Sequence, residues 1–266
     1  MRLRELSIIQ YQNIRPKPHP IPYWLSSESF EKQLEYVSKN DLQVLSIDDS
    51  IRYMMKEGNI IRSRPISLTF DNGYLDFYDY AFPILSKHRF PATLLISPRK
   101  VGKYREIGEQ KIPYLTWYLL REMAAEGIKI GAYEDDAWNI NQLPENAVLR
   151  HVTEYKKDLE DNLGTEIHYF GVKEGVPSQK IRDLLISEGY RAFLTECPTK
   201  QKTDLYAIGR IQVDDDDFNI FLTKISKTYL FFKDKRSWKY IREYSLDKLA
   251  HKLSESLDRM RGTKTH

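Results

Sequence analysis

The stretch ISLTFDNGYLDFYDYAFPILSKHRFPATLLI, from Ile66 to Ile96, reads as a strand, a helix and a second strand. The first apolar run ends abruptly at Asp71, where the turn-prone residues DNGY begin. A helical segment follows at 78–90, and the apolar run at 92–98 is the next expected strand. Two strands joined by a helix usually lie parallel in one sheet, so this stretch predicts an α/β fold.

The same alternation extends in both directions along the chain. Further strands are expected at 6–14, 42–49, 128–136, 167–175 and 191–196, and further helices at 26–40, 50–59, 116–127, 145–164 and 178–190. Repeated pairing of strands with helices favours parallel strands wrapped by helices, in a barrel or an open doubly wound sheet. Near the C-terminus a helical spacing of leucines predicts an amphipathic helix; these are Leu246, Leu249, Leu253 and Leu257.

Composition excludes several classes of protein. With 30% charged and 41% hydrophobic residues, the 266-residue chain has the balance of a soluble globular protein. The net charge of +3 is evenly spread and gives no case for a nucleic-acid partner. No run reaches the roughly 18 apolar residues of a membrane span. The N-terminal residues MRLRELSIIQYQN lack the pattern of a signal peptide, so we expect a cytoplasmic location.

Polar residues gather where the expected strands end. Parallel α/β folds place their chemistry at the carboxyl ends of the strands, which makes these residues the site candidates. They are Gln12 and Asn13, Asp71 and Asn72, Tyr133 to Asp136, Lys173 and Glu174, and Thr195 and Glu196. Three of them, Glu134, Asp135 and Asp136, are consecutive acids. Neighbouring side chains on a strand alternate in direction, so at most two acids point the same way. We favour a solvated acidic loop over an oxygen-ligated magnesium or calcium site.

The segment 66–96 resembles the first motif of the polysaccharide deacetylase family, carbohydrate esterase family 4 or the NodB-homology domain, whose pattern is T-F-D-D-G-Y. LTWYLLREMAAEGIKIG resembles the helix and strand before the family's H-S/T-x-x-H motif, and YFGVKEG stands where many members have F-A-Y-P-Y-G. GYRAFLT and IGRIQV follow in order. The resemblance implies a distorted (β/α) barrel with about seven parallel strands and helices outside. The chain length favours one domain over 1–266. The resemblance covers a core at 6–225 and leaves an extension at 226–266 that holds the expected amphipathic helix.

The family's chemistry, as the resemblance implies it, uses one Asp as base, a second Asp and two His for a divalent metal such as zinc, and a later His as general acid. Here the base position is Asp71, but the second Asp is Asn72, and the two His positions are Tyr133 and Ala137. Tyr11 and Gln12 stand where relatives often have Y-H. Zinc hydrolysis needs about three protein ligands and an open position. We therefore expect no metal site of the family type and no cofactor.

Asp71 itself has several interpretations. It could act as a base, bind a sugar hydroxyl, cap the DNGY turn or pair with Arg210. Tyr11, Tyr74, Tyr133 and Trp138 could stack on sugar rings or pack at the edge of the core. The residues that we expect to bind a ligand are Tyr11, Asn72, Tyr133, Glu134, Asp135, Glu174 and Arg210. His88 and His151 fall on outer helices and His168 precedes its strand, so these histidines are not expected at the site, whereas His19 in the proline-rich loop could fold over it.

The sequence is compatible with three functions. We favour a noncatalytic member of the family that binds a glycan, meaning a polysaccharide or oligosaccharide, or a protein partner in carbohydrate metabolism. The second is an active carbohydrate deacetylase, a hydrolase of non-peptide carbon–nitrogen bonds, with a reworked site around Asp71 and the acids at 134–136. The third is a glycoside hydrolase with two carboxyls at a defined separation. The resemblance also leaves an extracytoplasmic location as an alternative.

Overall fold

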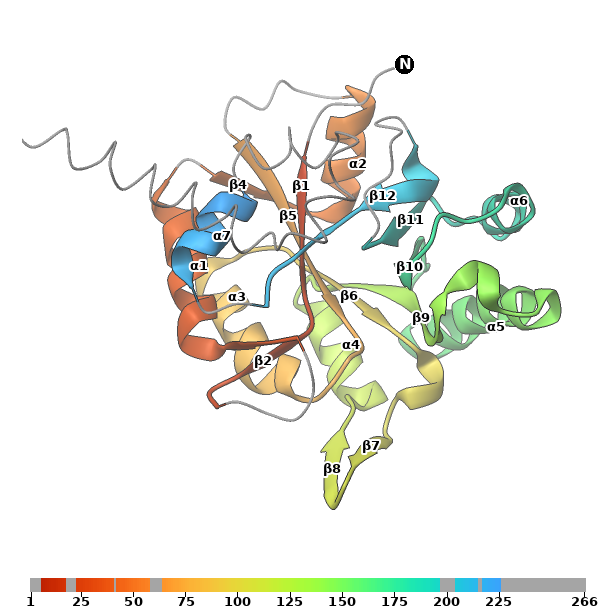
Figure 1. Cartoon of the computed structure of the whole chain (residues 1–266), viewed down its shortest axis with the longest axis horizontal. Helices are drawn as coiled ribbons and strands as arrows, with labels where there is room; N and C mark the ends of the chain where they lie inside the picture. Colours follow the sequence, from red (N-terminus) through yellow and green to blue (C-terminus); the bar gives the residue numbers. More distant parts are fainter. Residues whose placement is uncertain are drawn as a thin grey trace, which may run out of the picture.

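The computed structural model describes residues 6–17, 23–40, 42–57, 64–196, 204–214 and 217–225, with the backbone alone at 64 and 135–138. Nine of the described strands form one sheet in the order β12-β11-β10-β9-β6-β5-β1-β13, with β4 paired to β5 (Figure 1). All pairings within this sheet are parallel. The strands are β1 (Ser7–Tyr11), β4 (Leu42–Leu45), β5 (Arg64–Asp71), β6 (Thr93–Ile96), β9 (Lys129–Asn139), β10 (Tyr169–Glu174), β11 (Ala192–Thr195), β12 (Ile208–Gly209) and β13 (Ile211–Gln212).

The last two strands close the sheet on itself. β12 and β13 lie at opposite edges of the sheet, yet only Arg210 separates them in the sequence. The backbone N–H of Arg210 donates to Thr195 O at 2.8 Å, and that of Val213 donates to Gln10 O at 2.9 Å. This segment therefore joins β11 to β1, and the sheet becomes a nearly closed barrel. The predicted (β/α) barrel is confirmed, with short closing strands added to the expected ones.

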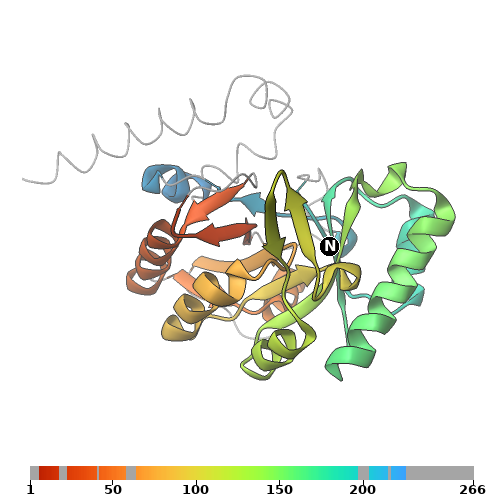
Figure 2. The same cartoon turned by 90° about the horizontal axis from the view of Figure 1, so that it is seen from below.

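Helices surround the sheet, as Figures 1 and 2 show. They are α1 (Ser27–Lys39), α2 (Ile47–Met55), α3 (Phe82–His88), α4 (Trp117–Ala125), α5 (Glu145–Leu163), α6 (Gln179–Ser187) and α7 (Phe218–Lys224). Several begin at a side-chain oxygen that accepts a backbone N–H, which satisfies a donor that the first turn leaves free. These caps are Ser26, Ser46, Thr116 and Ser178.

Shorter elements complete the described chain. β2 (Asn13–Arg15) pairs with β3 (Trp24–Ser26), and β7 (Tyr104–Ile107) forms an antiparallel hairpin with β8 (Gln110–Pro113). A π-helical turn, η1 (Phe77–Ala81), precedes α3. Single 3-10 turns are η2 (Pro98–Lys100), η3 (Ile140–Gln142) and η4 (Leu205–Ala207). The sequence predicted neither the hairpin nor the β2–β3 pair.

Alternate residues of each strand point to opposite faces of the sheet, and both faces are packed. One face packs under the helices, where Phe30, Leu34 and Val37 of α1 are buried as their helical spacing predicts. The other face fills the barrel, with Leu95 of β6 near its centre. A Cβ at Gly131 or Gly171 would lie 2.6 or 2.5 Å from a Leu95 methyl group. The two glycines on β9 and β10 thus make room for Leu95 inside the barrel.

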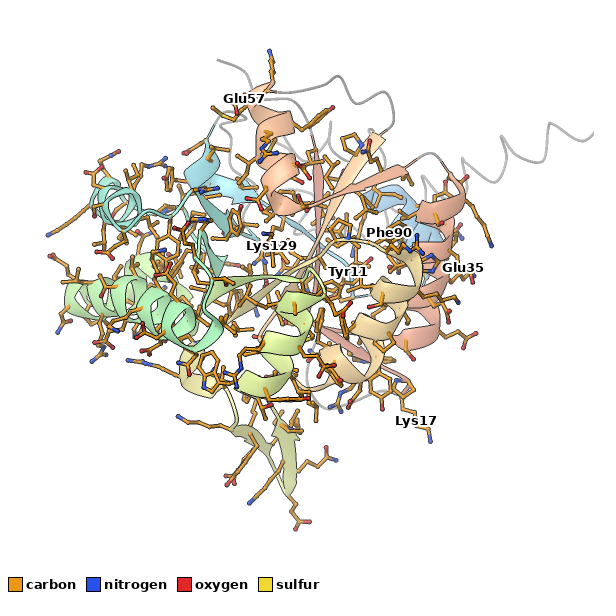
Figure 3. The ribbon with its side chains drawn as sticks, turned by 180° about the vertical axis from the view of Figure 1, so that it is seen from behind. Tyr11, Lys17, Glu35, Glu57, Phe90 and Lys129 are labelled. Carbon is orange, nitrogen blue, oxygen red and sulfur yellow. The ribbon has the colours of Figure 1, made fainter. Side chains whose placement is uncertain are left out.

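The predictions for the C-terminal part of the chain fall on residues that the structure does not describe. The amphipathic helix expected at 246–257 lies outside the described residues, as does the 226–266 extension. No helix among the residues that the structure covers is long and apolar enough to cross a membrane. In the view from behind, Glu35 and Lys129 mark α1 and the start of β9, and Tyr11 lies within the fold (Figure 3).

Candidate functional site

The site is built around a buried ion pair at the end of β5. Asp71 ends that strand, and Arg210 lies between β12 and β13 at the closure of the barrel. The two nitrogens Nη1 and Nη2 of Arg210 lie 2.5 and 3.0 Å from Oδ1 and Oδ2 of Asp71. Neither side chain has exposed surface. The pairing of Asp71 with Arg210, one of the alternatives that the sequence left open, is present, and it occupies both oxygens of the carboxylate.

The environment acts on the two charges in opposite ways. Burial raises the pKa of Asp71, while the charge of Arg210 and hydrogen bonds from Arg210, Gln10 and Tyr133 oppose that rise. Burial alone would lower the pKa of Arg210, but the Asp71 carboxylate more than offsets this, and the pKa of the guanidinium is raised. A bidentate pair of this geometry is most stable when both groups are charged. Asp71 therefore serves as the counter-ion of Arg210.

A second carboxyl, that of Glu196, lies beside the pair. The Nε2 atom of Gln10 donates to Asp71 Oδ2 at 2.6 Å and to Glu196 Oε1 at 2.7 Å, so one amide links both carboxyls. Gln12 Nε2 lies 3.3 Å from the same Glu196 oxygen. Burial raises the pKa of Glu196 to about 7; Arg210 opposes the shift and Asp71 adds to it. Glu196 thus exchanges its proton near neutral pH.

Glu196 was a strand-end candidate, but it was not among the residues that we expected to bind a ligand. Its link to Gln10 spans 186 positions and its link to Gln12 spans 184. Only the order of strands in the closed barrel brings these three residues together. The strand-end rule identified Glu196 and Gln12 as candidates, whereas Gln10 lies within a strand and gave no signal.

Around Glu196 we define the rim as Gln12, Tyr23, Asn72, Lys173 and Glu196, all partly exposed. The Glu196 N–H donates to Lys173 O at 3.0 Å, and Lys173 Nζ lies 4.5 Å from the centre of the Tyr23 ring. Burial lowers the pKa of Lys173, and Glu196, Glu174 and Asp71 oppose this. Burial raises the pKa of Tyr23, helped by the charges of Glu196, Asp214 and Glu174. Glu174 therefore lies near the rim.

The backbone of the turn after Asp71 explains why an asparagine suits position 72. Asn72 and Gly73 both have left-handed backbones, with φ of 73° and 72°. Asparagine tolerates this conformation better than most residues with a side chain. Its Nδ2 atom lies 3.5 Å from Gln12 Oε1, at the limit of a hydrogen bond. Asn72 is thus at the rim, as predicted, and its amide faces Gln12.

The acidic stretch on β9 is divided between two sides of the strand. Tyr133 faces the barrel, where it donates a hydrogen bond to Asp71. Glu134 faces α5 and is bonded to His151 Nδ1. β10 pairs with Glu134 and then with Asn139, so the backbone at 135–138 leaves the regular ladder. The side chain of Asp135 lies outside what the structure describes.

One placement differs from the expectations. Glu134 is 1% exposed, so the favoured solvated acidic loop is wrong for this residue. It also lies away from the rim, and the alternative grouping of the acids with Asp71 does not extend to it. His151 lies on the outer helix α5, as expected, and its side chain is only 3% exposed. A helical pattern locates the apolar face, and the position of His151 beside Val148 and Val152 placed it on that buried face.

Three of the aromatic candidates, Tyr11, Tyr74 and Tyr133, pack in the interior, and the side chain of Trp138 lies outside what the structure describes. Tyr11 has no exposed surface, stacks on Phe70 at 5.3 Å and donates its hydroxyl to Gln33 at 2.8 Å. Tyr74 is 2% exposed and stacks on Tyr114 at 4.6 Å. Tyr11 is therefore a core residue and does not face the rim.

The side chains beside Asp71 do not match a zinc site of the family type. Asn72 offers a neutral amide, the hydroxyl of Tyr133 is a donor to Asp71, and Asp71 is engaged by Arg210. Zinc in proteins prefers imidazole, thiolate and free carboxylate ligands, and a buried guanidinium repels a dication. Within the described ranges, which leave out His19, no group of three or more His, Cys, Asp or Glu residues is arranged to hold a metal ion.

A pocket of about 460 Å³ lies elsewhere, between the N-terminal ends of α5 and α6. Its lining is mostly apolar and includes Leu143, Val148, Leu149, Ile181 and Leu184. None of the predicted site residues whose side chains the structure describes lines it. The pocket is thus separate from Asp71 and the rim.

Comparison with known proteins supports the family resemblance. The model of the family described as "Polysaccharide deacetylase" matches residues 58–193. The poly-β-1,6-N-acetyl-D-glucosamine N-deacetylase of Staphylococcus aureus is 23% identical over 207 residues, 74% of this chain and 70% of that protein. YxkH of Bacillus subtilis, named for polysaccharide deacetylation, is 22% identical over 188 residues; the match spans 70% of this chain and 64% of YxkH. IcaB of Ammonifex degensii has the same fold, with a TM-score of 0.70 and 20% identity over 86% of this chain and 97% of its own.

Proposed function

The chain belongs to the polysaccharide deacetylase family, and we propose that it is a member that binds a glycan without metal-dependent deacetylation. The observation that carries this proposal is that Asp71 is buried and that both of its carboxylate oxygens already accept hydrogen bonds. A general base needs a free oxygen within reach of the water that it activates. Asp71 is 1% exposed, and Arg210, Gln10 and Tyr133 engage its two oxygens.

The absence of a metal-dependent reaction is also part of the proposal. Asn72 and Tyr133 stand at two of the metal-ligand positions that the resemblance indicates. A neutral amide and a phenol with an ordinary pKa near 10 are poor substitutes for a carboxylate and an imidazole. A dication at this place would also lie beside the buried charge of Arg210. We therefore propose that the chain uses no metal cofactor.

Glycan binding is supported by the rim and by the relatives. Lys173, Gln12 and Glu196 offer hydrogen-bond donors and acceptors, and Tyr23 offers an aromatic ring. Sugars bind through hydroxyl groups and through their C–H faces, which suit these groups. The S. aureus relative is named for a polymer of N-acetylglucosamine. A protein partner is the alternative ligand, and the cytoplasmic location and the single domain remain predictions from the sequence.

Two assays on the same protein test the proposal. Calorimetric titration with N-acetylated β-1,4- and β-1,6-linked glucosamine oligomers should show saturable binding. Acetate release from the same oligomers should not exceed the protein-free rate, with zinc or cobalt added or with a chelator. Acetate release that disappears in Asp71→Ala would contradict the proposal, and so would the lack of binding to any oligomer.

A second candidate is an active deacetylase with a reworked site. It is favoured by Glu196, because a carboxyl with a pKa of about 7 suits proton transfer at neutral pH. This candidate requires acetate release that is lost in Glu196→Gln. The exposed Glu154→Gln on α5 is the matched control, since it makes the same chemical change far from the rim.

A further inference from the structure

We propose that Glu196 is the carboxyl that contacts the ligand, and that its Oε2 atom accepts a hydrogen bond from a hydroxyl group of the bound sugar. This inference rests on the proposed glycan-binding function and assigns its recognition to a particular atom. Neither the family match nor the resemblance at Asp71 points to Glu196.

The hydrogen bonds of Glu196 leave one oxygen available. Gln10 and Gln12 both donate to Oε1. Among the residues that the structure describes, none forms a hydrogen bond with Oε2. Glu196 is also partly exposed, whereas Asp71 is buried and fully engaged. Of the two linked carboxyls, only that of Glu196 is placed to meet a ligand.

Gln10 acts as the positioning residue for this carboxyl. Its two amide hydrogens are directed to Asp71 and Glu196, and its own oxygen is buried without a hydrogen-bond partner in the described structure. The reversed amide would place that oxygen against two carboxylates, so the orientation of Gln10 is fixed by its neighbours. The hydrogen bond from Gln10 holds Glu196 Oε1 in place, so Oε2 is directed away from Gln10.

The neighbours of Glu196 supply the other elements of a sugar site. Lys173 on β10 provides an ammonium group, and Tyr23 next to β3 provides a ring that lies under Lys173. Tyr23 adopts a left-handed backbone with φ of 62°, a strained conformation for a bulky residue. An acceptor, a donor and an aromatic ring at one edge fit a hydroxyl-rich ligand.

The charge of Glu196 makes this contact sensitive to pH. The groups that face it are Asp71 from β5, Arg210 from the barrel closure, Lys173 from β10 and the Tyr23 hydroxyl, with the amides of Gln10 and Gln12. A carboxylate accepts a stronger hydrogen bond from a hydroxyl than the neutral acid does. Affinity should therefore rise as the pH passes through the region where Glu196 loses its proton.

The test compares the whole protein with Glu196→Gln, using N-acetylated chitotetraose in titrations at about pH 6 and about pH 8. The Gln oxygen can still accept from Gln10 and Gln12, so the fold should be kept, and thermal unfolding checks this. The wild type should bind more tightly at the higher pH. The variant should bind about tenfold more weakly at the higher pH, the loss expected for one charge-assisted hydrogen bond, and should show no pH dependence.

Repeating the titration in two buffers with different ionisation enthalpies gives a second readout. Proton release on binding should appear in the wild type and be absent in Glu196→Gln, which a purely structural role would not predict. Glu154→Gln should behave as the wild type in both experiments. Equal affinity and equal pH dependence of wild type and Glu196→Gln would overturn this inference while leaving glycan binding intact. A wild type that binds no oligomer would instead contradict the proposed function.

Discussion

The Nη1 atom of Arg210 lies 2.5 Å from Oδ1 of Asp71, although 139 positions separate the two residues in the sequence. This contact joins the end of β5 to the segment that closes the barrel. Both side chains are without exposed surface, so each charge depends on the other for its compensation. The ion pair therefore contributes both to the charge balance of the site and to the stability of the fold.

Removing one partner of this pair should be costly. Arg210→Met leaves the Asp71 carboxylate buried without its counter-ion, and we expect the free energy of unfolding to fall by about 3–5 kcal/mol. Urea denaturation measures this change. The double variant Asp71→Asn with Arg210→Met should be less destabilised than Arg210→Met alone, because no buried charge remains. Lys39→Ala, which removes an exposed pair with Glu35, is the control and should not shift the urea midpoint measurably. A small effect of Arg210→Met would show that water reaches Asp71.

Stability should decrease as the pH rises towards neutrality. Burial raises the pKa of Asp76 to about 7, against the opposing effect of Arg15, and Glu196 has a similar value. The folded chain keeps these protons up to about pH 7, while the unfolded chain releases them near pH 4. The folded state thus binds more protons between these limits. The free energy of unfolding should fall by on the order of 3 kcal/mol per group over this window and level off above it.

Urea denaturation at about pH 5 and about pH 8 measures this dependence. Asp76→Asn and Glu196→Gln should each flatten it, because each removes one titrating group. Glu154→Gln should leave the slope unchanged. A stability that rises between these two pH values would mean that paired carboxylates with lowered pKa values dominate instead.

Gly73 should be hard to replace. Its φ is 72°, and an added Cβ would lie 2.6 Å from Ile96 Cγ2. Gly73→Ala therefore combines a strained backbone with a steric clash, and we expect a loss of about 2–4 kcal/mol. Gly108 in the β7–β8 turn is the matched control, with φ of 58° and no atom within 4 Å of its Cβ position. Gly108→Ala should cost only about 1 kcal/mol. Similar losses in the two variants would show that Ile96 moves aside.

Tyr11→Phe should separate stability from ligand binding. The variant removes the hydroxyl that donates to Gln33 and leaves that buried amide oxygen without its donor, at a cost of about 1–2 kcal/mol. The affinity for N-acetylated chitotetraose should stay that of the wild type, because Tyr11 lies in the core. Calorimetric titration checks the second point, and weaker binding by Tyr11→Phe would place the ligand deeper in the barrel than the rim.

Much of the fold was accessible from the sequence because it depends on local patterns. The alternation of apolar runs with helical spacing located the main strands and helices, and the abrupt change at Asp71 located the end of β5. The β7–β8 hairpin was missed because most of its residues are exposed and polar, so no apolar alternation marks it. Short closing strands such as β12 and β13 have too few residues to show a period.

The site was less accessible because it depends on contacts between distant segments. The sequence suggested Arg210 as a partner of Asp71, yet nothing local indicates that Gln10 connects Asp71 with Glu196. Similarly, Tyr133 and Glu134 were both expected to bind a ligand, although neighbouring side chains on a strand point to opposite sides. Which side faces the barrel depends on the register with β10 and on the His151 contact from α5.

The closure of the barrel by 208–212 also has a consequence for synthesis on the ribosome. Until this segment leaves the exit tunnel, β1 and β11 have unpaired edges, and such edges attract other strands. Asp71 meanwhile remains hydrated, because its cationic partner is among the last parts of the barrel to be made. Nascent chains that stop before residue 208 should therefore depend on chaperones, and the full-length barrel should not.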